Sequence, residues 1–349
     1  MLYDMMKNAW GLEYSSCIVI ESLVACLAVF LLTVLATKLI LPVLRAKKLN
    51  QPINAYVAEH AGKAGTPTMG GICFIIASLL FTLVWIILEK CSVLGQSDNR
   101  AILPFILTLL LGVCNAFIGF YDDYKKLTKK QNEGLTEAQK FLLQIVVAGA
   151  YLITMGLTDN LPTALKIPFI DFSLELGWFA YLLYLVVIVG FVNSTNITDG
   201  LDGLASSVGV SVSVALLATS VVITSRYTGV MSGILLGSLL GFLVFNHYPA
   251  KIFMGDTGSL FIGGIIMGCA ISEGQLLAVI IMSMVFILDM LSSLWQRLYF
   301  KMTKGKRFFK KAPVHHHFQM LDWSEVKIVT VFFIVSAIFC AIGSLGIIL

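Results

Sequence analysis

The feature that most constrains this sequence is the recurrence of long apolar stretches from one end to the other. A helix needs about 20 mainly apolar residues to cross roughly 30 Å of hydrocarbon. Ten stretches reach or approach this length, at residues 17–41, 70–88, 101–121, 141–157, 178–195, 204–224, 230–246, 259–271, 276–297 and 326–348. We therefore expect an all-α polytopic membrane protein with about ten transmembrane helices.

Composition excludes the soluble alternatives. Of the 349 residues, 58% are hydrophobic and 13% are charged, against about 45–50% and about 25% in soluble domains. The mean hydropathy is +0.90. A cytosolic enzyme could not hide so much apolar surface, and we expect no nucleic-acid partner. The 7 cysteines are scattered, which predicts neither disulfides nor a zinc site. No domain boundary is evident, so residues 1–349 are expected to form one integral membrane domain.

The distribution of basic residues predicts the orientation. Sixteen Lys and Arg residues lie in one set of loops, at residues 42–69, 122–140, 196–203, 247–258 and 298–325. The opposite set, together with the N-terminal segment, holds only five, namely Lys7, Lys90, Arg100, Lys166 and Arg226. Cytoplasmic loops carry the excess of positive charge. The first set is therefore expected inside the cell and both chain ends outside.

Residues 158–177 form an outer segment in which apolar and polar residues alternate. It also contains two prolines. This pattern predicts a short hairpin lying on the outer surface.

Acidic residues gather on the predicted cytoplasmic side. Acids near transmembrane helices are costly and usually functional. Those on this side are Asp122, Asp123, Asp199, Asp202, Asp256 and, inside the ninth predicted span, Asp289. Adjacent carboxylates at a helix end either bind a divalent cation or mark the membrane interface. Mg²⁺ prefers such hard oxygen ligands.

Two further acidic segments have readings of their own. In Asn196-Ile-Thr-Asp-Gly-Leu-Asp-Gly203 the polar positions are three residues apart and share a face if helical; a polar turn is the alternative. The Gly255-Asp256 turn at a predicted helix start offers N–H groups and a carboxylate for a phosphate-bound metal. Phe253 either stacks on a base or anchors the interface.

Two more motifs lie on the same side. His315, His316 and His317 follow a basic run and suit an anionic phosphate better than zinc, because consecutive residues cannot all aim at one ion. The segment GTPTMGG at 65–71 either wraps phosphate or breaks a helix, and it does not match the common nucleotide-binding loops. Acids, cations and imidazoles gathered on the predicted cytoplasmic side favour phosphoryl chemistry on a membrane-bound substrate.

Together these motifs resemble a known family. GTPTMGG (65–71), FYDDYKK (120–126), NITDGLDG (196–203), NHYPAKIFMGDTGS (246–259) and PVHHHF (313–318) occur in order over nearly the whole chain. The sequence is similar to the phospho-N-acetylmuramoyl-pentapeptide transferases, within the polyprenyl-phosphate N-acetylhexosamine-1-phosphate transferase superfamily. The resemblance implies a Mg²⁺-dependent reaction in which UDP-N-acetylmuramoyl-pentapeptide and undecaprenyl phosphate give lipid I and UMP. It also implies a homodimer among the lipids of the bacterial cytoplasmic (inner) membrane, with the active site on the cytoplasmic face.

The resemblance carries roles to individual residues. It implies that Asp256 is a catalytic Mg²⁺ ligand, that Asp122 positions or deprotonates the lipid phosphate with support from Asp123, and that His315 is catalytic. The substrate-binding residues that it implies are Lys63, Lys126, Lys140, Asn196, Asp199, Gly200, Leu201, Asp202, Asn246, Phe253, Asp289, Gln296, His316 and His317. Two positions depart from the family pattern. A Glu is expected where this chain has Asp289, and an acid usually follows the His triplet where Gln319 stands here.

The sequence leaves three alternatives open, one in the mechanism and two in the function. Direct attack of the lipid phosphate on the β-phosphorus is the favoured route, with a covalent aspartyl intermediate as the other. A sister transferase acting on UDP-GlcNAc would share the Asp motifs, although GTPTMGG and the His triplet argue against it. A secondary transporter would place its acids near the midplane and often in paired repeats, whereas these acids lie at one face.

Overall fold

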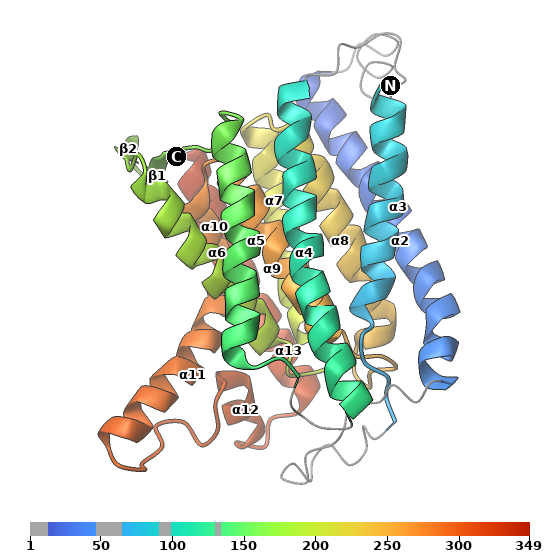
Figure 1. Ribbon diagram of the computed structural model, residues 1–349, viewed down its shortest axis with the longest axis vertical. Helices are drawn as coiled ribbons and strands as arrows, with labels where there is room; N and C mark the ends of the chain where they lie inside the picture. Colours follow the sequence, from blue (N-terminus) through green and yellow to red (C-terminus); the bar gives the residue numbers. More distant parts are fainter. Residues whose placement is uncertain (1–12, 47–64, 91–98, 130–133) are drawn as a thin grey trace.

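The computed structural model describes residues 13–46, 65–90, 99–129 and 134–349, and Lys63 lies outside them. Figure 1 shows a column of long, roughly aligned helices. They are α2 (Tyr14–Ala46), α3 (Gly71–Lys90), α4 (Asn99–Lys129), α5 (Glu137–Leu157), α6 (Phe179–Thr198), α7 (Leu204–Val222), α8 (Arg226–Asn246), α9 (Gly255–Ser272) and α13 (Glu325–Ile348). These nine are long and apolar enough to cross a membrane, within the described ranges. The predicted all-α polytopic membrane fold is confirmed.

The ninth predicted span differs from the prediction. Instead of one continuous helix over 276–297, the chain forms α10 (Leu276–Met282) and α11 (Met284–Met302), bent by 76° at Ser283. Helix α11 carries Asp289, Ser292 and Gln296 along one face, and these side chains contact the chain that follows α11. Figure 1 shows α11 leaving the column sideways, with the short helix α12 (Val314–Gln319) beside it.

The predicted hairpin is present between α5 and α6. Strands β1 (Ala164–Ile167) and β2 (Phe172–Glu175) pair antiparallel, with Ala164 opposite Glu175. Beside it, the N–H of Phe169 donates to the carbonyl of Gly346 at 3.2 Å. The last turn of α13 therefore lies at the same end of the bundle as the hairpin.

Helix α9 occupies the interior and sets the position of the site. It packs on α4 and α6, and 83% of its span is buried. A Cβ on Gly264 would lie 2.7 Å from the Cα of Gly112 on α4, so the two backbones touch. Small residues permit such close approach between membrane helices. This explains why the predicted span 259–271 looked short and glycine-rich, and it places the first turn of α9 beside the end of α4.

Candidate active site

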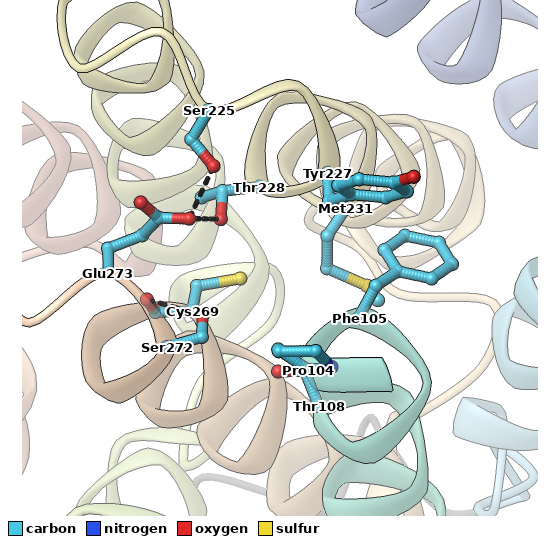
Figure 2. Close-up of a pocket in the computed structure, with 10 residues that line it drawn as sticks. All are labelled: Pro104, Phe105, Thr108, Ser225, Tyr227, Thr228, Met231, Cys269, Ser272 and Glu273. Atoms are coloured by element: carbon cyan, nitrogen blue, oxygen red, sulfur yellow. Dashed lines mark hydrogen bonds between the residues drawn. The ribbon is translucent and has the colours of Figure 1, made fainter. Parts of the chain in front are cut away.

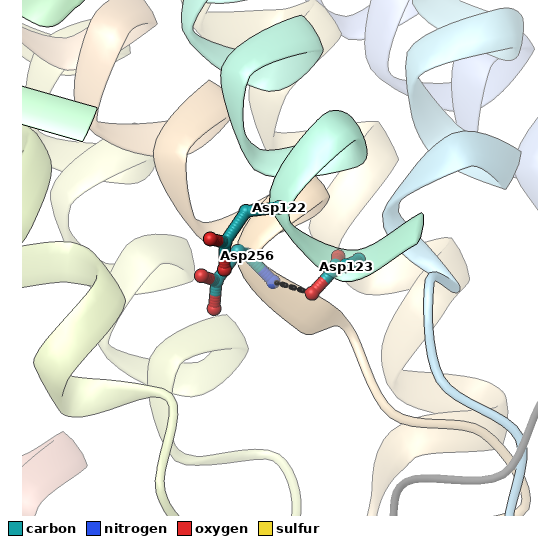
Figure 3. A group of neighbouring side chains, drawn as sticks. All are labelled: Asp122, Asp123 and Asp256. Atoms are coloured by element: carbon teal, nitrogen blue, oxygen red, sulfur yellow. Dashed lines mark hydrogen bonds between the residues drawn. The ribbon is translucent and has the colours of Figure 1, made fainter. Parts of the chain in front are cut away.

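Three carboxylates meet where α4 ends and α9 begins. Asp122 and Asp123 come from α4, and Asp256 comes from the first turn of α9. One oxygen from each lies within 4.8 Å of the others, which is close enough to hold one metal ion. Figure 3 shows the three side chains converging from the two helices. Two adjacent predicted acids and a third more than 100 residues later are thus brought together.

Asp123 caps helix α9. One carboxylate oxygen accepts the Thr257 N–H at 3.0 Å and the Thr257 hydroxyl at 2.7 Å. The other accepts the Asp256 N–H at 3.3 Å, the bond drawn in Figure 3. A helix N-terminus has unpaired N–H groups and a partial positive charge, so a buried carboxylate is stabilised there. Asp123 therefore fixes Asp256 relative to α4.

Two lysines share one oxygen of Asp256. Lys140 Nζ on α5 lies 2.7 Å from Asp256 Oδ2, and Lys126 Nζ on α4 lies 3.2 Å from it. Lys126 also pairs with Asp122 at 2.6 Å, one helical turn away. The other Asp256 oxygen accepts the Asn196 amide at 2.8 Å. Five of the predicted site residues are therefore joined in one bonded network.

The loop between α6 and α7 lies beside this network. Its Asp202 carboxylate accepts the Ala250 N–H at 2.9 Å. The Gly203 N–H donates to Asn246 Oδ1 at 3.1 Å, and the Asn246 amide donates to the Ile252 carbonyl at 3.0 Å. Asn246, predicted to bind substrate, is thus 2% exposed and ties the α6–α7 loop to the α8–α9 connection.

Asp199 stands just beyond the end of α6 and is partly buried. Burial raises the pKa of its carboxyl well above the usual range, and the nearby charges of Asp256, Asp123 and Asp202 raise this pKa further. The backbone N–H of Gly255 acts in the opposite direction. The neighbouring carboxylates at this end of the bundle therefore disfavour a negative charge on Asp199.

The histidine triplet divides into different surroundings. His315 has no exposed surface, and its Nδ1 lies 2.7 Å from Asp289 Oδ2. His316 Nδ1 contacts Gln319 Oε1 at 2.6 Å. His317 Nδ1 accepts the Lys310 N–H at 3.1 Å. Only the first histidine is turned into the bundle, toward the α6–α7 loop.

The remaining predicted residues lie around this centre. The Phe253 N–H donates to the Pro67 carbonyl, and the Gly70 N–H donates to the Phe253 carbonyl, both at 2.8 Å. The segment 65–71 therefore runs beside the Gly255–Asp256 turn. Leu201 is 4% exposed and belongs to the apolar core. Asp289 and Gln296 face the connection between α11 and α12.

Some contributors were not singled out from the sequence. Ser259 receives a bond from Asn196 at 2.9 Å, and Thr257 binds Asp123. Both follow Asp256 within one turn of a helix start, and that position was the available signal. The N–H of Leu135, which donates to Asp122 Oδ1 at 2.6 Å, is a backbone group and left no signal in the sequence.

A cavity of about 170 Å³ lies at the opposite end, among α4, α8 and α9. Figure 2 shows Glu273 there with the hydroxyls of Ser225 and Thr228, both of which donate to its carboxylate. No residue predicted to act in the site lines it. The candidate active site is therefore the acidic end.

Membrane-length helices that bring carboxylates and lysines together at one end define a multi-pass membrane protein with a charged site, and the comparisons with known proteins identify it as a transferase. In agreement, the family model described as Glycosyl transferase family 4 matches residues 105–274, and phospho-N-acetylmuramoyl-pentapeptide-transferase signature 1 matches residues 63–75. The chain is 39% identical over 317 residues to the phospho-N-acetylmuramoyl-pentapeptide-transferase of Staphylococcus carnosus (90% of this chain, 95% of that protein). It is 40% identical over 320 residues to that of Staphylococcus aureus strain bovine RF122 / ET3-1 (91% and 96%). The chain belongs to the phospho-N-acetylmuramoyl-pentapeptide-transferase family, which confirms the resemblance seen in its motifs.

Proposed function

We propose that the protein transfers phospho-N-acetylmuramoyl-pentapeptide from UDP-N-acetylmuramoyl-pentapeptide to undecaprenyl phosphate. The products are lipid I and UMP, and the step is the first membrane step of peptidoglycan synthesis. The observation that carries the proposal is the network of Asp122, Asp123, Asp256, Lys126 and Lys140 in a chain similar to its named relatives over about nine-tenths of its length.

The donor set fits Mg²⁺. Three carboxylates lie within 4.8 Å of one another, and Mg²⁺ is usually held by one or two carboxylates plus substrate phosphates. Asp256 would hold the ion together with Asp122, because both are paired with lysine side chains that can turn away, whereas Asp123 accepts backbone N–H groups of α9. When bound, Mg²⁺ would neutralise charge on the reacting phosphates.

The lysines have a separate task. Both substrates are anionic and repel each other, so cationic groups must offset their charge as they approach. Lys126 and Lys140 compete for one Asp256 oxygen and can turn to phosphate oxygens once that carboxylate is paired otherwise. Asn196, which accepts from Lys140 at 3.2 Å, keeps the α5 lysine directed at the site.

We favour direct attack of the lipid phosphate. An oxygen of that phosphate bonds to the β-phosphorus, and the bond from this phosphorus to the bridging oxygen breaks and releases UMP. Asp122, held by Lys126 and the Leu135 N–H, would position the attacking phosphate. Asp123 accepts three hydrogen bonds from α9, which makes it a poor nucleophile for the covalent route.

We place the site at the cytoplasmic face of the bacterial inner membrane. The supporting observation is that the basic run 301–311 follows α11, at the end of the bundle where α12 reaches the α6–α7 loop. The hairpin, the end of α13 and the start of α2, where Glu21 meets Arg226, lie at the other end, so we infer that α2 begins and α13 ends outside the cell. One core of buried apolar residues joins the long helices, which supports a single domain over 1–349. We also propose a homodimer, to be tested by light scattering in detergent.

The test is UMP release by the purified protein in detergent with undecaprenyl phosphate and Mg²⁺. We expect release from UDP-N-acetylmuramoyl-pentapeptide that requires the lipid and stops with EDTA. Release from UDP-GlcNAc instead would assign the chain to a sister transferase. No release from either donor, by folded protein, would contradict the proposal and favour a transporter.

A further inference from the structure

One face of α11 is used to hold the chain that follows it. Asp289, Ser292 and Gln296 are three and four residues apart and therefore share a face of the helix. Each of them binds backbone groups of the segment 308–315. This segment is the return path from the sideways end of α11 to α12 (Figure 1).

The three contacts run along the segment in order. The Gln296 side chain accepts the N–H groups of Phe308 and Phe309 at 3.1 and 2.9 Å. Ser292 Oγ accepts the Val314 N–H at 2.9 Å. At the bundle end, Asp289 contacts His315 twice. Its Oδ1 accepts a long hydrogen bond of 3.4 Å from the His315 backbone N–H, and its Oδ2 contacts the His315 imidazole. Asp289, Ser292 and Gln296 thus hold the connection folded back, which brings α12 to the site.

The last contact fixes an imidazole in one orientation. Asp289 and His315 both have 0% exposure, and their contact is 2.7 Å. A carboxylate only accepts, so Nδ1 of His315 must carry the hydrogen. Nε2 lies at the opposite edge of the ring, and it has no hydrogen-bond partner among the described residues. A buried polar atom left without a partner is costly and calls for a reason.

The Nε2 edge of the His315 ring lies against Gly200. A Cβ added at Gly200 would collide with Nε2 of His315. Gly200 stands between the two acids of the α6–α7 loop, and the far side of this loop is tied down by Asn246 and Ala250. The loop is therefore clamped between the α8–α9 connection and the imidazole ring.

We infer that Asp289 is a positioning residue that acts through His315 to hold the α6–α7 loop, and with it Asp199 and Asp202, in place for the nucleotide-sugar. The inference rests on the proposed function. It assigns Asp289 no contact with substrate. The acceptor phosphate, which we place at Asp122 on α4, does not depend on this clamp.

The first test is the steady-state kinetics of UMP release by Asp289→Ala. We expect the KM for UDP-N-acetylmuramoyl-pentapeptide to rise about 10- to 100-fold, because small misplacements of binding groups have effects of this size. The KM for undecaprenyl phosphate should stay within about twofold of wild type. Asp289→Asn should recover much of the loss, since its amide oxygen can still accept from Nδ1. Leu294→Ala, an exposed change on the opposite face of α11, is the control.

A second variant reaches the clamp from the other side. Gly200→Ala should raise the same KM, because its methyl group would push on the ring. Gly190→Ala in α6, where a Cβ meets nothing within 4 Å, should leave it unchanged. Combined with Asp289→Ala, which frees the ring to give way, Gly200→Ala should add less than its separate effect.

These outcomes separate the inference from the function. An unchanged KM in folded Asp289→Ala, equal increases in both KM values, or independent multiplication in the double variant would overturn the positioning role. Absence of lipid-dependent UMP release by the wild type would instead overturn the proposed function. If Asp289→Ala does not fold, Asp289→Asn with Gly200→Ala and Gly190→Ala decides the question. In that case, equal KM values for the two glycine variants would refute the clamp.

Discussion

The two ends of the bundle each bury charged side chains, but they satisfy them differently. At the end with the hairpin, Arg226 on α8 forms double contacts with Glu21 and Glu89, at 2.6 to 2.9 Å. The indole N–H of Trp85 also donates to Glu21 at 3.0 Å. All of these side chains are at most 9% exposed. This cluster joins α2, α3 and α8, and each of its four carboxylate oxygens accepts a hydrogen bond from the Arg226 guanidinium.

At the acidic end the excess of acidic side chains is larger. Five aspartates lie around two lysines, and both lysines contact the same oxygen of Asp256. A buried network with all partners present rigidifies a fold, whereas a surplus of one charge is a place for a ligand. We infer that the Arg226 cluster, whose carboxylate oxygens are all paired, serves stability, and that the Asp256 cluster serves binding and catalysis.

The largest expected effect is on activity at the acidic end. Asp256→Asn should lower the rate of UMP release on the order of 100-fold or more, since it removes the carboxylate charge at the centre of the site. The melting temperature in detergent should change little, because the amide keeps the shape of the side chain. Unaltered turnover in Asp256→Asn would show that the Asp256 carboxylate is not needed for catalysis.

The next effect is on stability at the other end. Arg226→Met leaves two buried carboxylates without their cation, which costs about 3–5 kcal/mol. Thermal unfolding in detergent should show a clear fall in melting temperature, while the activity of the remaining folded protein persists. Lys166→Met, an exposed cation on β1 at the same end, is the matched control and should be neutral. An equal fall in melting temperature in the two variants would show that the Arg226 cluster stabilises the fold no more than an exposed cation does.

A smaller effect of opposite sign is expected for Asp199→Asn. Because the folded-state pKa of Asp199 is raised, its favourable contribution to stability is present at low pH and is lost as pH rises through that pKa. At neutral pH the variant should therefore melt higher than wild type, and the difference should shrink on acidification. Its turnover should fall. A lower melting temperature at neutral pH would show that the Asp199 charge is compensated after all.

The smallest effect concerns the cap on α9. Thr257→Val removes one of the three donors to Asp123 and should cost about 1 kcal/mol of stability. Thr257→Ser keeps the hydroxyl and should behave like wild type in the same melting experiment. If the two variants melt alike, the side-chain bond does not contribute.

Much of the site could be predicted because its acids lie at helix ends. The apolar stretches predict Asp122 after the third span and Asp256 before the eighth. The positive charge of the loops predicts that both lie on the same side of the membrane. The pairing of Lys126 with Asp122 follows from their spacing of one turn. In contrast, Lys140 meets Asp256 across 116 positions of sequence, which only the packing of α5 against its neighbours decides.

The break in the ninth span could not be predicted from its hydropathy. Residues 276–297 are apolar enough for one helix, and the bend at Ser283 depends on what α11 gains by leaving the column. That gain is the contact of Asp289 with His315, 26 positions later. Its two partners belong to different elements, and neither residue indicates the other in the sequence.

We propose that the larger excess of acidic side chains, and not burial of charge as such, makes the acidic end the functional one. The most direct test is Mn²⁺ binding, followed by electron paramagnetic resonance, to the protein in phosphatidylcholine nanodiscs. We expect one saturable site in the wild type and in Arg226→Met, and its loss in Asp256→Asn. Undiminished binding in Asp256→Asn, or loss of the site in Arg226→Met, would contradict the assignment of the acidic end as the functional one.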